Sequence, residues 1–142
     1  MAWQTPKTDW YGYVNSDGVY IGDYFNYTDF NRIKNNLEFL HNLAVKLYDS
    51  FDIVSIGTDK TTSDYFYADE INHLEQNLNT INTKTINASY GSTPTYSANG
   101  YIMDFEELNR LESAILSLYN YLNTQATSRR MFTWNFGIKG GL

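Results

Sequence analysis

The sequence predicts a mainly α-helical fold, a three-helix bundle with helices at about 28–51, 68–84 and 103–125. Two observations lead to this prediction. Apolar residues recur with helical spacing in three stretches that resemble one another, and a β-rich run near the start is interrupted by a turn signal. At 142 residues the chain is expected to form a single domain, residues 1–142, opened by an extended arm over residues 1–9.

The first helix is the most clearly marked. Thr28 or Asp29 can cap its start, because the side-chain oxygen accepts hydrogen bonds from the free backbone N–H groups of the first turn. The apolar positions that follow are spaced alternately three and four residues apart, as in a heptad seam: Phe30, Ile33, Leu37, Leu40, Ala44, Leu47 and Phe51. Such a seam can close within one chain or be shared between chains.

The second and third helices repeat this spacing on one face each. The apolar positions are Ile71, Leu74, Leu78 and Ile81 in the second, and Leu108, Leu111, Ile115, Leu118 and Leu122 in the third. A linker over residues 53–66 joins the first two helices. Residues 88–100, which contain Pro94, form a loop of about a dozen residues, and loops of that length are often functional or bound to a partner.

Each predicted helix also opens with the same pattern, an acidic start followed by asparagine and, two residues later, Ile or Leu. The asparagines are Asn31, Asn72 and Asn109. They could form one site, or each could set the register of its helix or bond a carbonyl of a neighbouring loop, which is the commoner role of an amide beside an apolar seam. Internal duplication and convergence on a common helix start would both produce the pattern.

Two β elements are expected beside the helices. Asp-Gly at position 18 separates two β-rich runs and predicts a hairpin near 12–22, because glycine accepts the positive φ that the turn requires. Near the C-terminus, residues 131–138 alternate aromatic or aliphatic side chains with small or polar ones, which predicts a strand with one aromatic face.

Composition excludes several classes of function. The formal net charge is -6, which argues against a nucleic-acid partner. The chain has no cysteine, which excludes disulfides and thiolate metal sites. No apolar run approaches the length of about 20 residues that a membrane span needs. The opening residues lack the apolar core of a secretion signal, so synthesis and solubility in the cytoplasm are expected.

Chemistry-bearing motifs are missing from the sequence. His41 and His73 have no second ligand at metal spacing, so no metal or cofactor is expected. The acidic pairs at 69–70 and 106–107 are more typical of helix starts, where they complement the positive end of the helix dipole. We therefore predict that the protein is not an enzyme.

Aromatic residues crowd both ends of the chain, where polar residues are usual. Tryptophan and tyrosine are frequent in protein interfaces. These ends could pack on the chain's own bundle, with the C-terminal strand joining the hairpin, or on a neighbouring subunit. We interpret six of the residues as a partner interface, namely Trp3, Trp10, Tyr11, Tyr13, Trp134 and Phe136. An alternative is a sugar-binding surface on the long loop, made of Tyr90, Tyr96 and Tyr101.

Several stretches resemble a group of small virion structural proteins from tailed phages and prophages of Gram-positive bacteria. The resemblance spans nearly the whole chain and is most specific at PKTDW (6–10), DFNRIKNNL (29–37) and ELNRLE (107–112). Relative to that group, the hairpin looks like an insertion between Trp10 and the first helix. The group offers no catalytic residues to carry over.

The resemblance implies a structural subunit of the virion tail, in the tail itself, the baseplate or a fibre-attachment joint. Its partners would be other tail or baseplate proteins and further copies of itself, as a trimer or ring. The alternative function is a carbohydrate-binding module that contacts a host cell-wall polymer.

Overall fold

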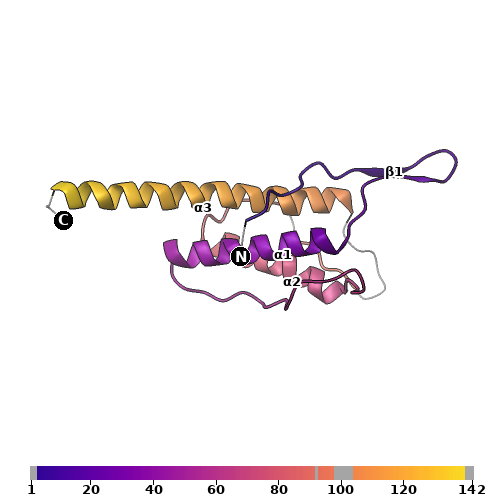
Figure 1. Cartoon of the computed structure of the whole chain (residues 1–142), viewed down its shortest axis with the longest axis horizontal. Helices are drawn as coiled ribbons and strands as arrows, with labels where there is room; N and C mark the ends of the chain where they lie inside the picture. Colours follow the sequence, from indigo (N-terminus) through magenta and orange to yellow (C-terminus); the bar gives the residue numbers. More distant parts are fainter. Residues whose placement is uncertain (1–2, 92, 98–103, 140–142) are drawn as a thin grey trace.

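The structure, a computed structural model, describes residues 3–91, 93–97 and 104–139, with side chains described as far as Ser128. Two short antiparallel strands, β1 (Gly12–Val14) and β2 (Tyr20–Gly22), precede three helices, α1 (Tyr27–Leu47), α2 (Ala68–Lys84) and α3 (Phe105–Lys139). The prediction of a mainly helical fold with three helices and a small hairpin is confirmed (Figure 1). In the hairpin turn, Gly18 has the expected positive φ of 77°.

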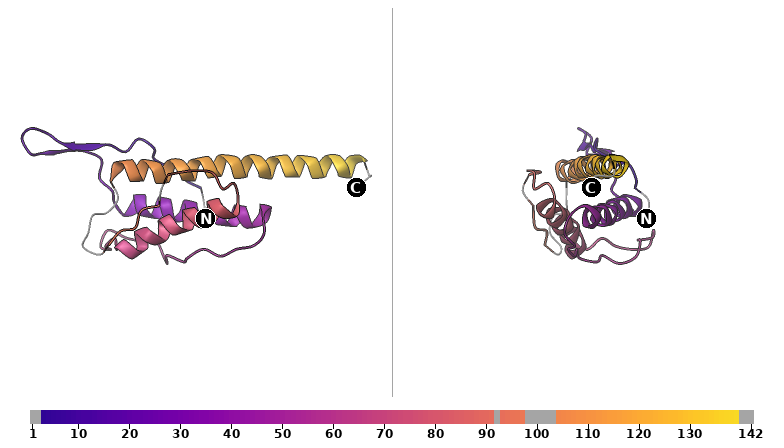
Figure 2. Two further views of the ribbon diagram at one scale, coloured as in Figure 1. Left: turned by 180° about the vertical axis from the view of Figure 1, so that it is seen from behind. Right: turned by 90° about the vertical axis from the view of Figure 1, so that its left-hand side faces the viewer.

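All three helices point in the same direction. Their first turns lie at the end of the bundle that carries the hairpin, and in end view they surround a common axis (Figure 2). Helices that follow one another in sequence usually run antiparallel, because a short loop then suffices. Here each connection must return along a whole helix, about 30 Å for the 21 residues of α1. The long connections after α1 and α2 therefore have a structural cause.

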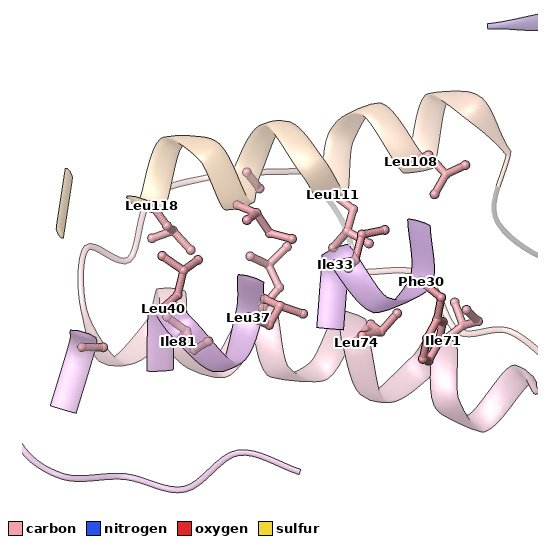
Figure 3. Close-up of a cluster of buried hydrophobic side chains, with 14 of the residues drawn as sticks. Phe30, Ile33, Leu37, Leu40, Ile71, Leu74, Ile81, Leu108, Leu111 and Leu118 are labelled. Carbon is pink, nitrogen blue, oxygen red and sulfur yellow. The ribbon is translucent and has the colours of Figure 1, made fainter. Parts of the chain in front are cut away.

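The helices enclose one apolar core, to which each helix contributes at equivalent positions. Three of its layers consist of Phe30, Ile71 and Leu108; of Ile33, Leu74 and Leu111; and of Leu40, Ile81 and Leu118 (Figure 3). None of these side chains is more than 2% exposed. Full burial of each contributes about 2 kcal/mol. The heptad seam is thus closed within a single chain.

The acidic openings are capping signals. In each case the residue directly before the helix lies five positions ahead of the repeated asparagine. A hydrogen bond between side chain and backbone joins this residue to the acid three positions further on. These pairs are Asn26 with Asp29, Tyr67 with Glu70, and Asp104 with Glu107. The cap of α1 is therefore Asn26 and not Thr28 or Asp29, as the sequence had suggested.

The first helix is shorter than the predicted span of 28–51. It ends at Leu47, and Tyr48 is already extended. Phe51 nevertheless packs against the core, because the chain folds back so that the ring of Phe51 meets His41 edge to face at 5.0 Å. The heptad spacing of Phe51, a partly buried aromatic residue, therefore does not mark a continuation of the helix.

The secondary structure predicted for the C-terminal residues was wrong. Instead of ending near 125 and being followed by a strand near 131–138, α3 continues to Lys139. A strand requires a neighbour to complete its hydrogen bonds, and the hairpin lies at the opposite end of the molecule (Figure 1). A helix satisfies its backbone groups internally, so α3 can project beyond the other two helices.

Candidate functional site

The three repeated asparagines hold extended segments against the bundle. In each case the side-chain amide donates to the carbonyl of one backbone residue and accepts from the N–H of the same residue, which we call an amide clamp. Asn31 clamps Lys60 at 2.9 and 2.8 Å, Asn72 clamps Tyr96 at 2.8 and 2.7 Å, and Asn109 clamps Trp10 at 2.9 and 2.7 Å.

Five residues further along α1 and α2, a second asparagine makes the same kind of clamp. Asn36 holds Gln4 at 2.7 and 2.9 Å, and Asn77 holds Val54 at 2.8 Å in both directions. Gln4 and Trp10 are six positions apart in the sequence, and so are Val54 and Lys60. The corresponding position on α3 is Ala114, which has no amide to offer.

The clamps follow a cyclic order around the bundle. The N-terminal segment (residues 3–10) is clamped by α1 and α3, and the second segment (residues 51–60) by α2 and α1. The third segment (residues 86–91 and 93–97) is clamped by α2 at Tyr96. The asparagines therefore do not converge on one site but bond neighbouring loop backbone. The repeat includes the segments as well as the helix starts, so the molecule has an internal threefold pattern.

Ion pairs between helices follow the same pattern. Arg32 of α1 makes two hydrogen bonds of 2.8 Å to Glu112 of α3, which is fully buried. Glu112 also accepts from the Trp10 indole at 2.6 Å and from the Lys7 backbone N–H at 3.1 Å. Four donors thus compensate the buried carboxylate, which makes this pair favourable despite its desolvation.

The equivalent pair between α3 and α2 is less complete. Arg110 bonds one oxygen of Glu75 and also bonds Glu107, while the second oxygen of Glu75 has no partner in the described structure. Burial is the largest influence and raises the pKa of Glu75 to about 7, although Arg110 opposes the shift. Between α2 and α1, the equivalent positions hold two basic residues, His73 and Lys34. Lys34 bonds Asp59 and the Gly57 carbonyl instead.

Two of the predicted interface residues pack inside the chain's own fold. Trp10 is 4% exposed and belongs to the core, so it is not available to a partner. Trp3 stacks on Tyr119 of α3, with the ring centroids 3.9 Å apart, and lies near Phe39. The N-terminal arm is extended, as predicted, but it is held against the bundle.

The remaining predicted residues fall in different places. Tyr11 and Tyr13 are more than half exposed. Trp134 and Phe136 lie on the projecting part of α3, beyond the described side chains. Tyr96 is 8% exposed and contributes to the core, so it presents no open ring face to a sugar. Tyr90 is half-buried and packs against the core. Tyr101 lies outside the described residues.

Exposed apolar side chains gather where the helices begin. This tyrosine-rich end comprises Tyr11, Tyr13, Val14, Val19, Ile21, Tyr24, Tyr65 and Tyr67. The hairpin supplies most of them, and contact between the Phe25 and Phe66 rings at 5.2 Å joins the hairpin side to the start of α2. The sequence prediction did not include Tyr65, which lies in the predicted linker over residues 53–66, or Tyr67, which directly follows that linker.

The described residues hold no group of three or more acidic or histidine side chains that could bind a metal ion. Within the same residues, no helix combines the length and apolar character that crossing a membrane requires. No protein-family model matches the chain, and no curated protein or solved structure matches it.

Proposed function

We propose that the protein is a structural subunit of a phage tail or baseplate, or of the joint that attaches a fibre, and that it acts through protein–protein contacts. The resemblance of its sequence to virion structural proteins suggests the setting. Within the molecule, the proposal is supported mainly by the tyrosine-rich end, where exposed rings and aliphatic side chains are concentrated. Surfaces of this composition are typical of interfaces.

The hairpin is the part of this end that the fold itself needs least. The second segment leads into its helix without such an insertion, and the core layers are complete without the hairpin. A two-stranded hairpin is at best marginally stable by itself. Exposed Val14 and Val19 on such an element favour a role in docking to another protein.

The two ends of the molecule differ, which suits a connecting subunit. The tyrosine-rich end lies at one extremity, and the projecting part of α3 lies at the other (Figure 1). Self-association as a trimer or ring remains part of the proposal. Because the heptad seam is buried within one chain, such an assembly would use these outer surfaces.

Incorporation into particles tests the proposal. Phage particles from the strain that encodes the chain should contain it, and a variant with Tyr13→Ser and Val19→Ser should be incorporated at least about tenfold less, the effect of losing roughly 1.4 kcal/mol of contact energy. Tyr121→Ser is a matched control, because Tyr121 and Tyr13 are 55% and 56% exposed and lie on different surfaces. Absence of the chain from purified particles would overturn the proposal.

The carbohydrate-binding alternative has less support from the long loop, because Tyr96 is buried in the core and Tyr90 is half-buried against it. It would have to use the tyrosines of the hairpin end. A glycan array separates the two functions, since a structural subunit should bind no host polymer. Binding that is lost in Tyr24→Ala and Tyr65→Ala would favour the sugar module.

A further inference from the structure

The groove between α2 and α3 is the incomplete part of the internal threefold pattern. Ala114 stands where the other helices carry a clamping asparagine. The third segment therefore lacks a clamp at Tyr90, the position equivalent to Gln4 and Val54. Three buried side-chain oxygen atoms lack a hydrogen-bond partner in the described structure, and all three lie here. They are Glu75 Oε2, Tyr90 Oη and Tyr96 Oη. A cavity of about 140 Å³ adjoins Tyr90 and Arg110.

The third segment covers the charged cluster of this groove. At Gly91 a Cβ atom would lie 2.8 Å from Cδ of Arg110, so the backbone there passes directly over the arginine side chain. Burial, and to a lesser degree the charge of Glu75, raise the pKa of the Tyr96 hydroxyl. Moving the segment away would therefore admit water to Glu75 and Arg110.

We propose that the third segment is the releasable part of this fold and that ionisation of Glu75 promotes its release. The N-terminal and second segments are each clamped twice, and the ion pair under the N-terminal segment is saturated by four donors. The third segment keeps one clamp from the repeating set, at Tyr96, and a local bond pair between Asn82 and Ala88. Counting only the described residues, these four bonds are fewer than those that hold either of the other two segments to the bundle.

The charges around Glu75 give the direction of the effect. Arg110 favours the ionised form, whereas burial and Glu107 disfavour it, and burial dominates. From the third segment, Tyr96 contributes a hydroxyl without a partner, and Asp104 at the start of α3 adds further negative charge beside it. A carboxyl whose pKa is raised in the closed state stabilises that state below its ordinary pKa, and this stabilisation is lost as the pH rises through about 7.

Amide hydrogen exchange on the purified chain tests the inference, independently of any assembly role. After correction for intrinsic exchange, protection at Ala88 and Tyr96 should fall by on the order of tenfold between pH 5.5 and pH 8, as expected for an acid raised from 4.5 to about 7. Val54 and Lys60, in the second segment, serve as internal references and should keep their protection.

Two variants complete the test. Glu75→Gln removes the charge and should abolish the pH dependence at Ala88 and Tyr96, whereas Glu112→Gln alters the saturated pair and should leave that dependence intact. The inference is overturned if wild-type Ala88 and Tyr96 respond to pH no more than Val54 and Lys60. It is also overturned if Glu75→Gln folds and retains the full response.

Discussion

Replacing Asn77 by aspartate tests the amide clamps directly, because the two side chains share a shape and differ in one hydrogen-bond donor. Asn77 is 2% exposed, donates to the Val54 carbonyl at 2.8 Å and accepts from the Val54 N–H at 2.8 Å. An ionised carboxylate keeps the second bond and turns the first contact into repulsion between two oxygens. Losing one bond costs about 1 kcal/mol, and an unpaired buried carbonyl costs about 1–3 kcal/mol more. Desolvation of the new charge adds to this.

We therefore expect Asn77→Asp to lower the free energy of unfolding at pH 7 by at least about 3 kcal/mol. At pH 4 the loss should be smaller, because a protonated carboxyl again donates to the Val54 carbonyl. Urea unfolding at both pH values, against wild type, measures this difference. Asn79→Asp is the control, since Asn79 is exposed on the same helix. Equal losses at both pH values, or a loss no larger than that of Asn79→Asp, would refute the energetic role of the clamp.

Three other substitutions probe the core, the saturated ion pair and the N-terminal segment. Leu111→Asp should abolish the helical circular-dichroism signal, because it buries an unpaired charge at a cost of about 4 kcal/mol or more; a folded variant would contradict the assigned seam. Glu112→Gln should cost about 2–3 kcal/mol in urea unfolding, since one of its two acceptor oxygens facing Arg32 becomes a donor, and a loss under about 1 kcal/mol would count against that network. Trp3→Ala removes the stack on Tyr119 and should cost about 2 kcal/mol. An unchanged thermal midpoint would show that the N-terminal segment does not pack in solution.

Local signals in the sequence were sufficient for the elements and most of the core. The spacing of Phe30, Leu37 and Leu111 reports which side of a helix meets apolar surroundings, and Asp-Gly reports the turn at Gly18. These features depend on residues within one or two turns of one another, so they can be recognised without knowledge of the fold. The extent of α3 escaped this reasoning, because alternating aromatic residues are compatible with a strand only when a neighbouring strand exists.

By itself, then, the sequence determined where the helices and the hairpin begin, which side chains of the helices enter the core, and that the three helices begin alike. Only the tertiary structure decided that the helices run parallel, that their seam closes within one chain, and that Trp10 faces inward. It also decided that the asparagines hold loop backbone, as when Asn109 clamps a residue 99 positions away. Periodicity identifies an apolar face but not the surface that covers it, and bonds between such distant residues form only when the complete chain brings them together.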